Sequence, residues 1–305
     1  MTRPTDPDAA PPLGLRMPKA MSVPGICRGA LTQWPQLHAA IHELSLDPAS
    51  RPAFVGGPGA TQAQRVGGPV QLQAALASDA GYLSRPTPPP DLYAWFVWLT
   101  LRVYQGARRF NLTLQHLPDL FQAAPGTTQA DRGEWVKEVL AGTAGLLACA
   151  QGISLQASTF ARHLHGIESD LGAARAAHQQ AAEVFSQPSP VGDNQQPASI
   201  NAHGLARQLA QQTQYQLAHL QLSAARVTAL SVLDNMTKAT DTLVESWQRM
   251  VLQLETIAAR PVAELGNLEL LRNTFYLDEA TPEWGAFAGV IQAFVQGTLL
   301  TVRAR

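Results

Sequence analysis

A seven-residue repeat of apolar positions runs through the middle of this 305-residue chain. Its steps alternate between four and three residues, which keeps one stripe of a helix turned toward a partner helix. At about 1.5 Å per residue, a continuous helix over residues 134–185 is ~78 Å long, and such a helix cannot wrap a compact globule. The repeat consists of Trp135, Val139, Gly142, Leu146, Cys149, Ile153, Gln156, Phe160, Leu164, Ile167, Leu171, Ala174, His178, Ala181 and Phe185.

A second repeat of the same kind follows, and Pro261 ends the helix that it predicts. The stretch between the repeats, SQPSPVGDNQQPASI (residues 186–200), is polar and rich in the turn formers Pro and Gly. Short connections join antiparallel helices. The repeat loosens near residues 234–238, and it consists of Leu205, Leu209, Leu220, Ala224, Val227, Leu230, Leu233, Thr237, Thr240, Val244, Trp247, Val251, Leu254 and Ala258.

These patterns predict an all-α protein, an elongated helical bundle with a long antiparallel coiled-coil hairpin. We expect the hairpin stalk over residues 134–259, with its polar tip at residues 186–200. Further helices near residues 92–124 and 282–302 thicken the base, and the last one is expected to start with Thr281 as its cap and Pro282 in its first turn. We expect residues 1–28 to form a flexible Pro-rich tail. Residues 29–305 are expected to form a single elongated helical bundle.

The charge and hydropathy of the chain limit its partners. The net charge is -1, so nothing favours nucleic acid as a partner. No run of about 18 consecutive apolar residues occurs, which predicts a soluble protein without a constitutive membrane span. The N-terminal residues lack the apolar core of a signal peptide, so any release from the cell would follow a non-classical route.

We find no pattern typical of an enzyme, a cofactor site or a metal site. The nucleophile elbow, the phosphate-binding loop and the dinucleotide-binding glycine motif are all absent. His38 and His42 lie four residues apart on one predicted helix face, but no third ligand accompanies them. Cys27 and Cys149 are too few for a disulfide framework. We therefore expect no catalytic, cofactor-binding or metal-binding residues.

The layout resembles the α-helical pore-forming toxins related to cytolysin A, which include haemolysin BL, non-haemolytic enterotoxin and α-xenorhabdolysin components. The segments that carry the resemblance are EWVKEVLAGTAGLLACAQGISLQASTFARHLHGIESDLGAA, LDNMTKATDTLVESWQRMVLQLETIAARP and PEWGAFAGVIQAFVQGTLL. Many members carry an apolar tongue at the tip, where this chain has its polar turn. The resemblance therefore implies a secreted, membrane-associated component of a cytolytic or insecticidal toxin, acting with a second helical toxin subunit that inserts in the membrane.

Two groups of residues are candidates for contact with a membrane or a partner. The first is aromatic and lies within YAWFVWLTL: Tyr93, Trp95, Phe96, Trp98 and Leu99. Residues at this spacing are more often core anchors at the thick end of a bundle, and a conditional membrane contact would require them to become exposed. The second group is the tip itself: Val191, Gly192, Asp193 and Asn194. A non-toxic elongated helical scaffold or adaptor protein is the alternative function.

Overall fold

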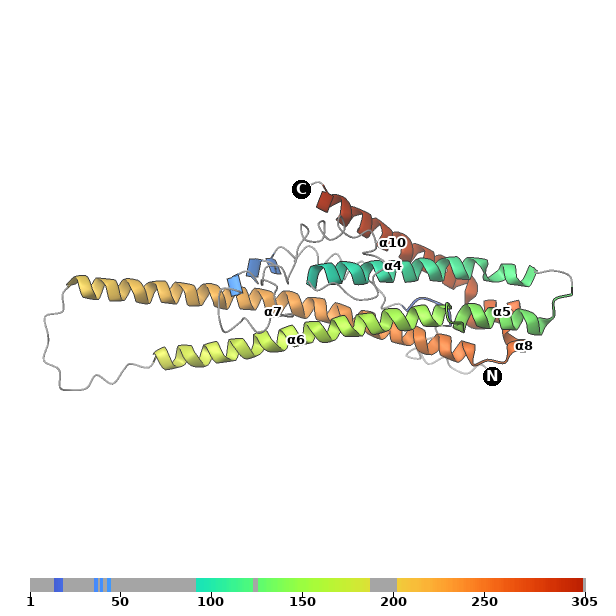
Figure 1. Cartoon of the computed structure of the whole chain (residues 1–305), viewed down its shortest axis with the longest axis horizontal. Helices are drawn as coiled ribbons and strands as arrows, with labels where there is room; N and C mark the ends of the chain where they lie inside the picture. The colour runs from blue at the N-terminus through green and yellow to red at the C-terminus, as the bar shows by residue number, and fades with distance from the viewer. Residues whose placement is uncertain are drawn as a thin grey trace, which may run out of the picture.

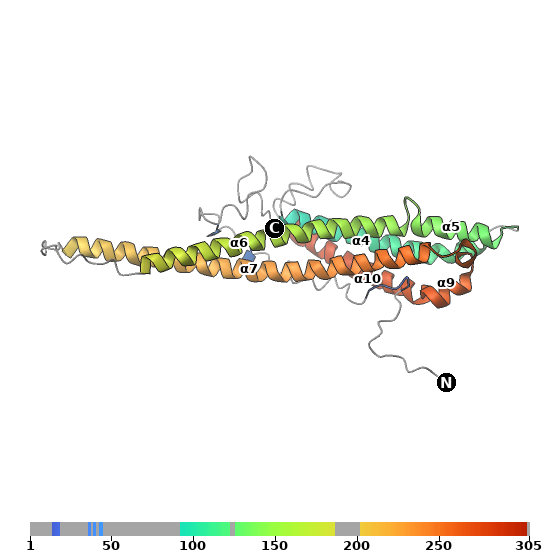
Figure 2. The same cartoon turned by 90° about the horizontal axis from the view of Figure 1, so that it is seen from below.

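The computed structural model describes residues 14–18, 36–37, 39–40, 43–44, 92–122, 126–186 and 202–303. These residues contain helices and connecting turns but no strand, which confirms the all-α class (Figure 1). The elements are α4 (Leu92–His116), the 3-10 helix η3 (Leu117–Gln122), α5 (Gln129–Ala141), α6 (Leu146–Ser186), α7 (Ala202–Ala258), α8 (Val262–Leu265), α9 (Leu268–Phe275) and α10 (Leu277–Arg303). Figures 1 and 2 show that the molecule is elongated along α6 and α7.

Helices α6 and α7 pack side by side and run antiparallel. The side chain of Gln151 on α6 donates to Glu255 on α7, and Thr237 on α7 donates to Glu168 on α6. A step of 17 residues forward along α6 thus matches a step of 18 residues back along α7. At this register the end of α6 lies level with about residue 220, so about 18 residues of α7 extend beyond it.

The predicted continuous helix over residues 134–185 is wrong in one place, because α5 ends at Ala141 and α6 begins at Leu146. Gly142 adopts an extended conformation and Gly145 donates to its carbonyl oxygen over 2.7 Å, so two glycines close a tight turn. The repeat also changes face here. Trp135, predicted on the buried seam, is 42% exposed, and Val136 is buried in its place.

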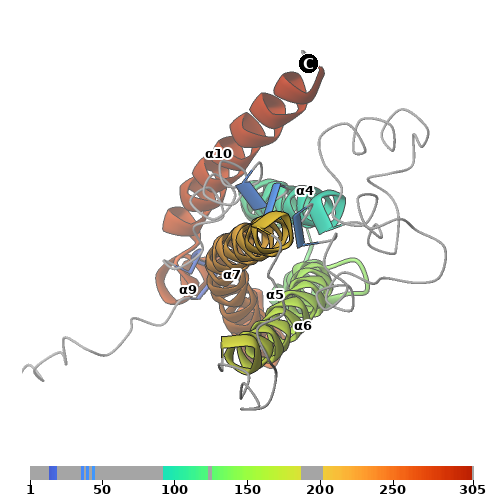
Figure 3. The ribbon, with the colours of Figure 1, turned by 90° about the vertical axis from the view of Figure 1, so that its left-hand side faces the viewer.

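The base of the molecule is a bundle in which α4 packs against α6 and α10, with α7 beside them (Figure 3). Its centre is an aromatic cluster of Phe110, Trp247 and Trp284. The ring of Phe110 stacks on that of Trp284 with centroids 4.4 Å apart, and the two tryptophan rings are 5.9 Å apart. Gly106 on α4 allows the helices to approach closely, because a Cβ there would clash with Ile153. Leu37 and Leu44 belong to the same hydrophobic core.

Helix α10 begins at Leu277, five residues earlier than predicted. Thr281 does not cap it but lies inside it, and its hydroxyl donates to the carbonyl of Leu277 over 3.0 Å. Pro282 is therefore internal to the helix and leaves one backbone hydrogen bond unmade. Leu277, Ala280 and Trp284 are all buried on one face, and this burial favours the longer helix despite the proline.

Residues 14–18 differ from the expectation of a flexible tail, because they bind along α9 and α10. Leu15 is fully buried, its amide donates to the carbonyl of Phe275, and its carbonyl accepts from the indole of Trp284. Arg16 pairs with the carboxylate of Glu283, and the amide of Met17 donates to the same group. The rest of residues 1–28 lies outside the described residues. We call residues 14–18 the N-terminal strap.

Candidate functional site

The aromatic segment near the start of α4 lies in the core. Phe96, Trp98 and Leu99 are each at most 4% exposed, and Trp95 is half-buried. Trp95 packs edge-on against Phe160 of α6, with ring centroids 5.4 Å apart. Tyr93 lies in the same helix, but its side chain is outside the described residues. Phe96, Trp98 and Leu99 are therefore packed in the core, and Trp95 lies between α4 and the middle of α6.

The tip residues Val191, Gly192, Asp193 and Asn194 all lie outside the described residues. The same is true of His38 and His42, the pair considered for a metal.

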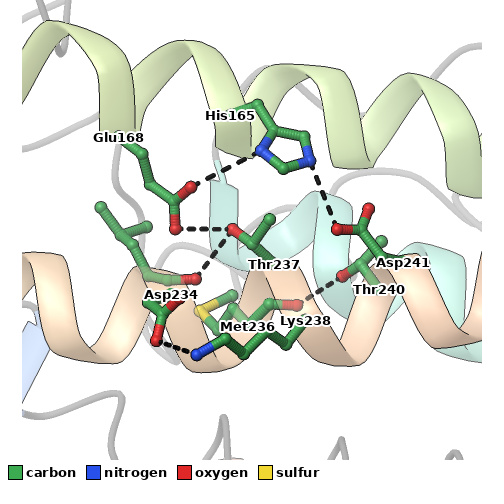
Figure 4. Close-up of polar contacts among 9 residues, drawn as sticks. His165, Glu168, Asp234, Met236, Thr237, Lys238, Thr240 and Asp241 are labelled. Atoms are coloured by element: carbon green, nitrogen blue, oxygen red, sulfur yellow. Dashed lines mark hydrogen bonds and ion pairs between the residues drawn. The ribbon is translucent and has the colours of Figure 1, made fainter.

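A polar cluster that the sequence analysis did not identify joins α6 to α7 (Figure 4). The imidazole of His165 lies between two carboxylates, with Nδ1 3.6 Å from Glu168 Oε2 and Nε2 3.4 Å from Asp241 Oδ2. The hydroxyl of Thr237 lies 2.8 Å from Glu168 Oε1 and 2.9 Å from the carbonyl oxygen of Leu233. This cluster coincides with the part of α7 where the apolar repeat loosens.

The geometry of this cluster suits a connector between helices rather than a catalyst. Glu168 and Asp241 face opposite nitrogens of the His165 ring, so one ion cannot be held by all three side chains. A neutral imidazole donates from one nitrogen only, so both carboxylates receive a hydrogen only when the ring is protonated. The side chain of His165 is 54% exposed and that of Asp241 44% exposed, so water screens these attractions and each contributes little to stability. Sequence reasoning missed the cluster because Glu168 and Thr237 are separated by 69 residues.

The distal part of α7 exposes a row of apolar and small side chains. The row shares Leu220, Ala224 and Val227 with the predicted repeat and extends them toward the distal end with steps of three and four residues, and we call it the α7 outer seam. Its members are Ala210, Thr213, Leu217, Leu220, Ala224 and Val227, all exposed. Leu217 is 56%, Leu220 64% and Val227 52% exposed.

The predicted seam contact of Leu220, Ala224 and Val227 with α6 is wrong. Figures 1 and 3 show that α6 and α7 diverge toward their distal ends, and α6 ends before α7 does. The buried position on α7 accordingly moves from Val227 to the neighbouring Arg226. An exposed row of apolar residues at this spacing is typical of a helix that pairs with another helix.

The described residues contain no cluster of three or more His, Cys, Asp or Glu side chains that could hold a metal ion. Burial raises the pKa of the Cys149 thiol, which keeps it in its less reactive protonated form. Partial burial beside Trp95 lowers the pKa of His163, whose ring centroid is 5.1 Å from that of the indole.

One helical stretch among the described residues, Gln129–Ala176, has the length and mean hydropathy of a membrane-crossing helix. This stretch contains Gln, Ser and Thr, so it is no uninterrupted apolar run, but its mean hydropathy is still high. Core helices of soluble proteins meet the same criterion, and Leu146, Ile153 and Phe160 of this stretch are buried. Its composition alone therefore does not distinguish a core helix from an inserting one.

No family model, no curated protein and no solved structure matches this chain.

Proposed function

We propose that this protein is a component of a multi-subunit α-pore-forming toxin, cytolytic or insecticidal, which acts with a second helical subunit that inserts in the membrane. The observation that carries the proposal is the pair α6 and α7, a rod in which α7 extends about 18 residues beyond its partner helix. A rod of this kind suits a subunit that reaches from a bundle at its base toward another protein. The antiparallel coiled-coil hairpin, with seven-residue packing over the part where α6 and α7 stay in contact, is part of this proposal.

The burial of the aromatic segment supports a role that needs a partner. An inserting helix must present apolar side chains over about 30 Å of hydrocarbon. Phe96 and Trp98 are packed in the core, and exposing each would cost about 1.5–3 kcal/mol. A partner or receptor would have to offset this cost before the segment could reach a membrane.

Dye release from liposomes tests the proposed function. We expect the purified chain alone to release no dye at sub-micromolar concentration. When the chain is mixed with the product of a neighbouring gene that encodes a similar bundle with an apolar tip, we expect dye release that needs both proteins. Release by the single chain would contradict the division of labour, and the absence of release and of cell lysis with the partner would contradict the toxin function.

A non-toxic elongated scaffold or adaptor is the second candidate function. It is favoured by the burial of Phe96, Trp98 and Leu99, since none of these is available for a membrane in the described state. In a scaffold, the base bundle and the distal end of α7 would each hold a partner, and the stiff rod would set the distance between them. Capture of two partners at opposite ends without any lytic activity would support this function over the first.

A further inference from the structure

We propose that the α7 outer seam is a self-association surface, where the distal part of α7 pairs antiparallel with the same part of a second copy of this chain. The seam has the spacing of a coiled-coil interface, with steps of three, four, three, four and three residues from Ala210 to Val227. Its six positions are exposed, although they are apolar or small. This surface is separate from the proposed toxin function, which needs no second copy.

The order of side chains along the seam fits an antiparallel pair with two-fold symmetry. The symmetry axis passes between Leu217 and Leu220, so Leu217 of one copy faces Leu220 of the other. The same symmetry places Thr213 opposite Ala224 and Ala210 opposite Val227. Large residues therefore meet at the centre, Val227 faces the small Ala210 at the ends, and two small residues, Thr213 and Ala224, face each other between them. A two-fold interface requires this kind of self-complementary patch.

The absence of charge on this part of α7 favours a second copy over a charged partner. Residues 208–225 contain no Asp, Glu, Lys or Arg. Charged residues beside a coiled-coil seam normally select the partner and repel identical helices. Within residues 208–225 there is thus no fixed charge to repel an identical helix or to attract one of opposite charge, and Arg226, at the end of the seam, is buried. Gln214 and Gln221, both exposed beside the seam, are neutral donors and acceptors.

The seam is short, which sets the expected strength of the pairing. From Ala210 to Val227 a helix rises about 26 Å, and a contact of this length belongs with the small, transient interfaces. We therefore expect a dissociation constant of roughly tens of micromolar. Ala210, Thr213 and Leu217 lie where α7 extends past α6, and the other three members lie beside the diverging end of α6. Two copies would therefore overlap at their distal ends, and the dimer would be longer than the monomer.

Sedimentation equilibrium and small-angle scattering between about 5 and 300 µM test the proposal on the full chain. We expect the average mass to rise with concentration and the maximum dimension to increase by roughly 40%, since about 40 residues of α7 lie on each side of the symmetry axis. The double substitution L217K/L220K should abolish both changes. The control is Leu155→Lys, which places one lysine on a similarly exposed leucine of α6 (66%) and should leave association unchanged. Circular dichroism checks that all variants keep their helical content.

Three outcomes would overturn the proposal. The first is a wild-type chain that stays monomeric at 300 µM. The second is self-association that L217K/L220K leaves intact or that Leu155→Lys also removes. The third is a dimer no longer than the monomer, which would place the contact along the base. If instead the monomer binds neutral phosphatidylcholine vesicles and L217K/L220K removes that binding, the seam is a lipid-contacting surface and the proposal is wrong.

Discussion

The base and the distal half of the α6–α7 pair have related sequence patterns but different surroundings. At the base, α4 and α10 cover the pair, and Trp247 and Trp284 are fully buried. In the distal half the same spacing of apolar residues continues on α7, yet Leu217 and Leu220 are more than half exposed. A seven-residue repeat thus predicts a helix that can pair, but whether it is paired depends on how many helices are present at that height.

The largest expected effect concerns the tryptophans of the base, where a buried and an exposed position can be compared. Trp284→Ala should lower the free energy of unfolding by about 3–5 kcal/mol, because it leaves a cavity beside the rings of Phe110 and Trp247. It also removes the hydrogen bond to the N-terminal strap. The matched control is Trp135→Ala, which truncates the same residue type at a 42% exposed position and should cost less than about 1 kcal/mol. Equal costs in urea titrations would show that the aromatic cluster is not the centre of the base.

Leucines of α6 beyond the base should have a smaller effect. Leu164 and Leu171 are fully buried, but fewer helices surround them and the site can relax. We expect Leu→Ala at either position to cost about 2 kcal/mol, the low end for a buried leucine. Deleting residues 191–195 of the predicted tip should cost much less, since loops tolerate changes in length. Thermal melts compare the variants, and a deletion more damaging than Leu171→Ala would contradict this ranking.

The polar cluster allows a finer comparison of two threonines on α7. Thr237 lies within hydrogen-bond distance of both its own helix and Glu168 of α6, whereas Thr242 donates only to the carbonyl of Lys238. Thr237→Val should cost about 1–2 kcal/mol, because it leaves a carboxylate oxygen without its donor. Thr242→Val should be neutral within about 0.5 kcal/mol. Denaturant titrations that give the same cost for both would remove the cluster as a contact between helices.

The smallest effect concerns acidification near the start of α4. Desolvation lowers the pKa of His163 in the folded chain, so the unfolded chain takes up the proton at a higher pH. The corresponding stability is present above the ordinary histidine pKa of about 6.5 and is lost as the pH falls toward the lowered value. His163→Gln should therefore reduce the fall in Tm between pH 7.5 and 5.5. His116→Gln, at an exposed site, serves as the control, and an unchanged slope in the first variant would contradict the prediction.

The sequence predicted the all-α class and the buried face of α6 from Leu146 to Leu171, because that face depends only on local periodicity. It did not predict the break between α5 and α6, where the tight turn at Gly142 and Gly145 outweighs a repeat that continues in register. The cluster around His165 was also missed. Its partners lie on another helix, so only the register between α6 and α7 brings them together.

For the aromatic segment of α4 and for the α7 outer seam, the sequence indicated the residues but not whether their side chains are buried or exposed. The aromatic segment of α4 was identified from composition, but composition does not say whether Trp98 faces a membrane or a core. The α7 outer seam was also present in the predicted repeat through Leu220 and Val227. Its exposure depends on the divergence of the two helices, which no pattern within one helix indicates.

The N-terminal strap has a consequence for how the chain folds during its synthesis. The carbonyl of Leu15 accepts a hydrogen bond from Trp284, a residue 269 positions later in the chain. A ribosome that adds about 5–20 residues per second makes Trp284 roughly 13–54 seconds after Leu15. Until Phe275 has been made, Leu15 lacks the carbonyl that its amide binds, and until Trp284 has been made it lacks the indole that donates to its own carbonyl. The strap can therefore close only after nearly the whole chain has been translated, and the first part of the chain to be made is among the last to reach its native contacts.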